Sequence, residues 1–204
     1  MKSIGIYDFL DNHRGLIDQS RREPIYSKMA AYGIDNAVLD EGQALYVKAN
    51  DLQMDYDAAK KEVDIADDEV SETWEEATRA LIPMRTLVRA LVIRQPLIAA
   101  QLHLKGAVPR SHAGWLHFAD RFYASLHEHP QVRQRLLGID AAEGLVQKFR
   151  QILAKREVLQ QEQREAKVLR DEAHNALYDW GLVVKTIARL VVVDYPGYRR
   201  GLGL

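Results

Sequence analysis

The chain contains one unit twice, and this duplication restricts its possible folds more than any other feature. Residues 84–104, MRTLVRALVIRQPLIAAQLHL, align with residues 184–204 at a constant offset of 100, with six identities. The identical pairs are Thr86/Thr186, Arg89/Arg189, Val92/Val192, Pro96/Pro196, Leu102/Leu202 and Leu104/Leu204. Upstream, the segment YGID at 32–35 corresponds to LGID at 137–140. The first helical repeat therefore covers residues 1–105 and the second covers 106–204, either as two domains or as one intertwined domain.

The apolar residues recur with helical spacing in both repeats. From Val38 to Val70, apolar or small residues alternate in steps of four and three, and a similar stripe runs from Leu145 to Val191. This heptad spacing is typical of a helix that packs along one side. No glycine or proline interrupts the chain between Gln43 and Ile82. The pattern predicts an all-α fold.

Two all-α architectures fit this pattern. In the first, each repeat carries one long helix, at about 36–94 and 141–193, with Pro83 bending the first. In the second, each repeat is a helical hairpin, with a turn near 64–68 in the first repeat, giving two bundles side by side. Residues 160–174 contain no turn signal, which favours the long helices.

The charge pattern also favours the long helices. Residues 62–76 hold eight acidic side chains and no basic one, whereas residues 148–170 hold seven basic side chains. Two long antiparallel helices would place these segments beside each other, and such charges select partner and register. We therefore predict two long antiparallel helices with short flanking helices forming a bundle at each end, and keep the hairpins as the alternative.

Shorter helices are predicted at 4–22 and 115–127, and paired signals precede each long helix. A proline opens a short helix, a glycine ends it in a left-handed conformation, and an aspartate caps the long helix. These residues are Pro24 and Pro130, Gly33 and Gly138, and Asp35 and Asp140. Residues 105–114 are the predicted link between repeats. Residues 195–204 could dock on a bundle or a partner, but their low complexity favours a mobile end.

Composition restricts the classes of function. The formal net charge is −1, which argues against a protein built to grip nucleic acid or an anionic membrane. There are no cysteines, so disulfides and thiolate metal sites are excluded, and a cytoplasmic location is expected. The longest apolar run, 182–193, is broken by Lys185 and Arg189 and is too short to span a bilayer.

No pattern indicates catalysis, a metal or a cofactor. Five of the seven histidines fall within residues 103–129, but they form no i, i+4 pair on one helix face. The nearest match to a di-iron motif is Asp171-Glu-Ala-His174, and the repeat partner of His174 is Trp74. There is no glycine-rich phosphate loop and no Gly-x-Ser-x-Gly. We expect no catalytic residues, no metal ligands and no cofactor.

The candidate binding residues are basic positions that both repeats share. Arg85/Lys185 and Arg89/Arg189 lie four apart on one helical face, so each pair is a candidate anion or ligand site. The alternative is a structural role, in which Arg89 pairs with Asp140 or Glu143 and Arg189 pairs with Asp35 or Glu41.

The segment 32–45, YGIDNAVLDEGQAL, resembles a stretch in uncharacterised bacterial all-helical bundle proteins, of the form Tyr-Gly-x-Asp followed by Leu-x-Glu-Gly-x-x-Leu. Leu39, Glu41, Gly42 and Leu45 occupy the second part. The resemblance implies an all-helical fold and no known activity, so it assigns no functional residue.

The sequence thus predicts a helical scaffold or protein-interaction protein without catalytic activity. Its expected partner is another protein or a second copy of itself, with no nucleic acid and no membrane. The alternative is a metal- or small-ligand-binding helical bundle with a site between helices.

Overall fold

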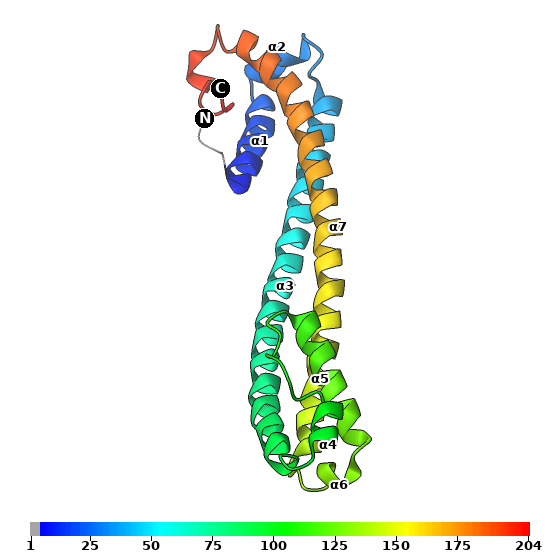
Figure 1. Cartoon of the computed structure of the whole chain (residues 1–204). Coiled ribbons are helices and arrows are strands. Elements are labelled where there is room, and N and C mark those ends of the chain that lie inside the picture. Colours follow the sequence, from blue (N-terminus) through cyan, green and yellow to red (C-terminus); the bar gives the residue numbers. More distant parts are fainter. Residues whose placement is uncertain (1–4) are drawn as a thin grey trace. The chain divides into compact units, whose positions relative to one another are not determined.

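The computed structural model describes residues 5–204, and every regular element in this range is a helix (Figure 1). The helices are α1 (Ile6–Ser20), α2 (Ile25–Ala30), α3 (Asn36–Leu91), α4 (Pro96–Gln101), α5 (His112–His127), α6 (Pro130–Arg133) and α7 (Ile139–Val191), and a short 3₁₀ helix covers Pro196–Tyr198. The chain forms two compact units. Of the described residues, unit 1 contains 5–61 and 161–204, and unit 2 contains 62–160.

Two helices are far longer than the rest, as predicted. α3 has 56 residues and α7 has 53, and their bounds lie within three residues of the predicted ones. The hairpin alternative is wrong, because α3 continues without a break through 64–68. The segments of α3 and α7 within each unit pack against each other and run antiparallel.

The predicted contact between the acidic and basic segments is present in unit 2. Glu76 pairs with Lys148 at 3.7 Å, Glu69 pairs with Lys155 at 3.3 Å, and Asp67 pairs with Arg156. As the residue numbers rise along α3, the numbers of their partners fall along α7, so these ion pairs fix an antiparallel register. Exposed pairs of this kind contribute little energy each, and their main effect is to select the register.

The core of unit 1 forms where α1 and α2 cover the start of α3 and the end of α7. Leu16, Ile17, Ile25 and Met29 are fully buried there. Trp180 of α7 crosses α3 at Gly42, and its indole Nε1 donates to the carbonyl of Val38 at 3.0 Å. The missing side chain of Gly42 therefore leaves the space that the Trp180 indole occupies.

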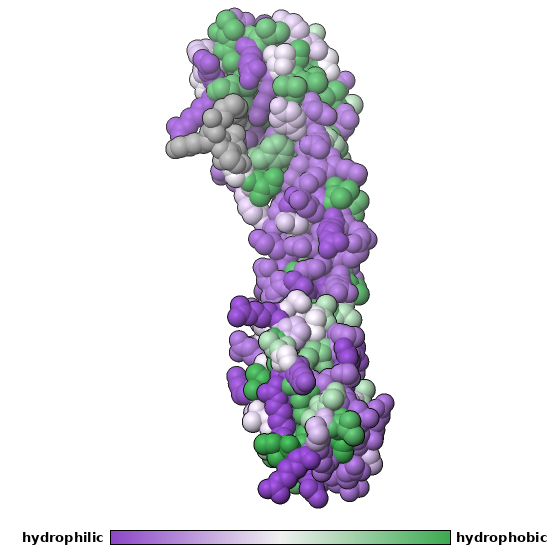
Figure 2. Space-filling view, in the orientation of Figure 1, coloured by the Kyte–Doolittle hydropathy of each residue, from purple (hydrophilic) through white to green (hydrophobic). Residues whose placement is uncertain are grey.

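The core of unit 2 has the same plan, with α5 in the place of α1. Trp115 and Phe122 of α5 pack with Leu81 of α3 and Phe149 of α7, all fully buried. Where α3 and α7 are not covered by short helices, their surface is mostly hydrophilic (Figure 2).

Most of the predicted boundary signals are confirmed. Gly33 and Gly138 have φ angles of 86° and 77°, and the Asp35 carboxylate accepts from the Val38 amide at 3.1 Å as an N-cap. Asp140 is not an N-cap. It is the second residue of α7, and its carboxylate accepts from Arg133 instead.

The prediction of a mobile end for residues 195–204 is wrong. Leu202 is fully buried in the core of unit 1, as its counterpart Leu102 is in unit 2. The hydroxyl of Tyr198 donates to the carbonyl of Glu23 at 3.3 Å. The last turn of the chain is therefore part of the packing.

Candidate functional site

The basic residues predicted in the first repeat hold the chain after α4. The Arg85 side chain is only 6% exposed, and its Nη2 donates to the carbonyls of Leu104 at 2.7 Å and Gly106 at 2.8 Å. Arg89 also donates to Leu104, from Nε at 3.1 Å and from Nη2. Burial lowers the pKa of Arg85, and the neighbouring Arg89 lowers it further.

These contacts correct the predicted pairing of Arg89 with Asp140 or Glu143. Both carboxylates are bound by Arg133, and Glu143 also accepts from His127 at 2.9 Å. Two arginines therefore anchor a loop through its carbonyls, because those carbonyls are not used by helical hydrogen bonds.

The basic residues predicted in the second repeat are less engaged. Lys185 is half-buried, and burial lowers its pKa, with Arg189 adding to the shift. Arg189 is exposed and makes no hydrogen bond or ion pair with the residues that the structure describes. The predicted pairing with Asp35 or Glu41 is absent, since the Asp35 carboxylate caps α3.

Each repeat carries an equivalent pocket beside its arginine. The pocket in unit 1 has a volume of about 430 Å³, and the one in unit 2 has about 350 Å³. All six residues that line the first have counterparts in the second at an offset of 100: Arg189, Val192, Val193, Pro196, Arg199 and Leu204. The duplication has thus preserved a local surface as well as a core.

A face of α7 beside the unit 1 pocket exposes large apolar side chains. Tyr178, Leu182, Val183, Leu190 and, just after the helix, Val193 are each more than half exposed. Asn175, Asp179, Thr186 and Arg189 lie among them and are also exposed. We call these nine residues the α7 face. Contiguous exposed apolar residues rimmed by polar ones often mark interaction sites.

The α7 face has heptad spacing. Asn175, Asp179, Leu182, Thr186, Arg189 and Val193 follow one another in alternating steps of four and three. Val183 and Leu190 lie on one flank of this seam, whereas Tyr178 and Lys185 lie on the other. The hydroxyl of Thr186 donates to the carbonyl of Leu182 at 2.8 Å, so it is satisfied within the helix.

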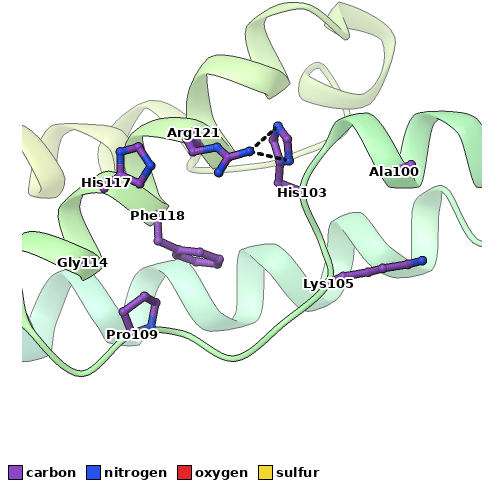
Figure 3. Close-up of a pocket in the computed structure, with 8 residues that line it drawn as sticks. All are labelled: Ala100, His103, Lys105, Pro109, Gly114, His117, Phe118 and Arg121. Atoms are coloured by element: carbon purple, nitrogen blue, oxygen red, sulfur yellow. Dashed lines mark hydrogen bonds between the residues drawn. The ribbon is translucent and has the colours of Figure 1, made fainter.

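A different pocket, of about 540 Å³, lies in unit 2 between α4, the loop after it and α5 (Figure 3). It combines basic and imidazole side chains with an apolar wall. Its lining residues are Ala100, His103, Lys105, Pro109, Gly114, His117, Phe118 and Arg121. Figure 3 shows Arg121 reaching from α5 to the ring of His103, with the Phe118 ring turned towards the loop that carries Pro109.

Unit 1 contains two buried histidines, of which only His174 was considered from the sequence, as part of the rejected di-iron match. His13 is 3% exposed, its Nδ1 lies 2.8 Å from the carbonyl of Phe9, and its ring contacts Gly181. His174 is 9% exposed and its ring centroid lies 5.7 Å from that of Phe9. Burial lowers the pKa of both; Lys185 lowers it further at His13, as Arg170 does at His174. Only the apolar spacing around His13 indicated that it would be buried.

The structure describes residues 5–204. No group of three or more side chains of the histidine, aspartate and glutamate types is placed to hold a metal ion in that range. No helix there is long and apolar enough to cross a membrane. Comparisons with protein-family models, curated proteins and solved structures found no match.

Proposed function

We propose that this protein is a non-enzymatic helical scaffold that acts by helix-to-helix association, and that a second copy of the chain is a partner of the α7 face. The observation that carries this proposal is the self-complementary pattern of that face. When two copies of the face run antiparallel, an acidic residue lies opposite a basic one, and apolar residues lie opposite apolar ones on one flank. A two-fold interface requires such matching, because residue i meets j while j meets i.

The matching is clearest in the seam. With the two-fold axis beside residue 184, Asp179 lies opposite Arg189 of the second copy, and Leu182 lies opposite Thr186. Each pairing occurs twice by symmetry. Antiparallel coiled coils pair their seam positions in this alternating way. The carboxylate meets a guanidinium that has no partner among the described residues of its own chain.

The flanks match in the same register. Val183 lies opposite Leu190 of the second copy on one side, and Tyr178 lies opposite Lys185 on the other. The first pair buries apolar surface, and the second places an ammonium beside an aromatic ring. A parallel arrangement would instead place Asp179 beside Asp179 and Arg189 beside Arg189, which is repulsive.

The equivalent face of α3 lacks this complementarity, although it keeps the exposed apolar positions Ile82 and Ile93. Arg79 occupies the position of Asp179, so the same register would place Arg79 opposite Arg89. The proposed self-association therefore uses α7 and not the equivalent face of α3.

The test uses charge reversal and restoration, with the mass in solution measured by light scattering over a dilution series. The unaltered chain is expected to show the mass of two copies at high concentration. Asp179→Arg and Arg189→Asp are each expected to shift it towards one copy, and the double variant is expected to recover it. Arg94→Asp, which changes an exposed arginine of unit 2, is the control and should leave association unchanged.

A chain that stays monomeric at all concentrations would contradict the proposal, as would equal effects of Arg189→Asp and Arg94→Asp. Far-UV circular dichroism shows whether each variant is folded. If the chain is monomeric, a different protein is the partner to seek for this face.

The cytoplasmic location and the membership in a bacterial helical family are also proposals. The first is supported by the absence of cysteine, and the second by the segment 32–45. The alternative function, a small-ligand-binding bundle, is favoured by one feature, the basic pocket of unit 2.

A further inference from the structure

The pocket shown in Figure 3 gathers positive charge without an acidic side chain. Lys105 and Arg121 carry fixed charges, and His103 and His117 add imidazole groups that can donate hydrogen bonds. None of the eight lining residues is acidic. In Figure 3 the Lys105 ammonium points away from the Arg121 guanidinium, so a bound anion would meet positive charge chiefly at Arg121 and its neighbouring imidazole.

The backbone at His103 adds an independent observation. His103 has a φ angle of 47°, in the left-handed region that disfavours residues with a side chain. At the equivalent position the second repeat has Gly203, with a φ angle of 66°. The same turn is therefore built with glycine in one repeat and with histidine in the other, where the imidazole projects towards Arg121. A strained residue at a pocket indicates a functional constraint.

The Arg121 guanidinium has hydrogen-bond donors that no described residue uses. Its Nη2 lies 3.1 and 3.3 Å from the two ring nitrogens of His103, and no hydrogen bond within residues 5–204 engages its Nε or Nη1. The adjacent carboxylate of Asp120 is taken by Arg150 of α7. A planar guanidinium with free donors is suited to a phosphate or carboxylate group.

The other side of the pocket is apolar. Phe118 and Pro109 form this wall, and Arg85 lies over the Phe118 ring at 4.9 Å from its centroid. Arg85 is itself fixed by the carbonyls of Leu104 and Gly106, so the Phe118 ring is held in place. A ring held in this way offers a flat surface for an aromatic group of a ligand.

We infer that this pocket binds a phosphate monoester that carries an aromatic or similarly flat apolar group. The phosphate faces Arg121 and His103, and the apolar group rests against Phe118. The Arg121 guanidinium supplies a fixed positive charge and a planar set of donors for the phosphate oxygens. The volume is within the range of small-molecule sites. This inference does not depend on the α7 contact, which uses residues of unit 1 only.

Isothermal titration calorimetry of the full chain with phenyl phosphate tests the inference. One site per chain is expected. Arg121→Gln should weaken binding by about tenfold or more, because it removes charge-assisted hydrogen bonds. Arg94→Gln, which changes an exposed arginine of unit 2 outside the pocket, should weaken it less than about twofold.

A second variant separates binding from folding. His103→Gly reproduces the residue of the second repeat, so it should raise the midpoint of urea unfolding while it weakens phenyl phosphate binding. Benzyl alcohol, which lacks the phosphate, and inorganic phosphate, which lacks the ring, should each bind more weakly than phenyl phosphate. The inference is overturned by no measurable heat, by equal effects of Arg121→Gln and Arg94→Gln, or by benzyl alcohol binding as well as phenyl phosphate.

Discussion

Gly42→Ala should destabilise unit 1, because α7 leaves no room for a side chain at this point of α3. A Cβ atom added to Gly42 would lie 2.1 Å from Cζ2 of Trp180, 2.3 Å from Cε2 and 2.6 Å from Cη2. Carbon atoms in contact normally lie about 3.5–4.0 Å apart. The Trp180 indole is 8% exposed and cannot move aside without leaving its hydrogen bond to the Val38 carbonyl.

The size of the effect follows from these contacts. Overpacking a filled core costs about 1–3 kcal/mol. Leaving the indole N–H unpaired adds about 1–3 kcal/mol to this loss of stability. The higher helix propensity of alanine relative to glycine offsets about 0.5–1 kcal/mol of it. A net loss of about 1–5 kcal/mol is large beside the usual stability of about 5–15 kcal/mol.

The chain offers a matched control in Gly144, an exposed glycine of α7 with no atom within 4 Å of an added Cβ. Gly144→Ala should stabilise the protein by about 0.5–1 kcal/mol. Urea unfolding, followed by tryptophan fluorescence and far-UV circular dichroism, measures both variants. If Gly42→Ala unfolds at the same or a higher urea concentration than the unaltered chain, the close approach of Trp180 to α3 is refuted.

Three further predictions concern buried polar groups. Gly181→Ala would place a Cβ 2.4 Å from Nε2 of His13 and should lower the free energy of unfolding in urea by about 1–3 kcal/mol. Adding His13→Ala to the same chain should restore part of that stability. If the two losses of stability simply add, the contact between Gly181 and His13 is contradicted. Burial holds the pKa of His13 and His174 below 6.5, so the unfolded chain binds more protons just below that pH. Unit 1 should therefore lose stability as the pH falls from about 7 to about 5, and amide hydrogen exchange equally protected at both pH values would contradict this. Arg85→Gln should lower the free energy of unfolding by about 2–4 kcal/mol and let the backbone amides of the loop after α4 exchange with solvent. Lys185→Gln should lower it by less. Equal losses of stability in the two variants would contradict the anchoring role of Arg85.

The long helices were predictable because their evidence is local and repeated. Heptad spacing, the absence of breakers and the opposite charges of 62–76 and 148–170 all indicate two antiparallel helices, and the structure has them. The caps at Gly33 and Gly138 follow from glycine chemistry in the same way. Asp140 was misplaced because a nearby arginine, Arg133, competes for its carboxylate.

The environments of the candidate residues were less predictable, because they depend on loops. Arg85 and Arg89 bind carbonyls of residues 15 to 21 positions away, and no pattern in the sequence specifies a bond to a backbone carbonyl. The buried end of the chain was missed for a related reason. Its glycines suggest mobility, whereas the repeat identity Leu102/Leu202 already indicated a buried leucine.

The distance between spin labels in the associated protein tests the proposed antiparallel contact of two α7 faces most directly. The chain has no cysteine, so a single introduced cysteine carries the only label. Labels at Val183→Cys lie next to the proposed two-fold axis and should be close across the contact. Labels at Glu172→Cys should lie 24 residues apart along the helices, or about 36 Å. A short distance at 183 with a long one at 172 is the result that we predict. Equal distances at both positions, or no intermolecular coupling at either, would contradict the self-complementary contact.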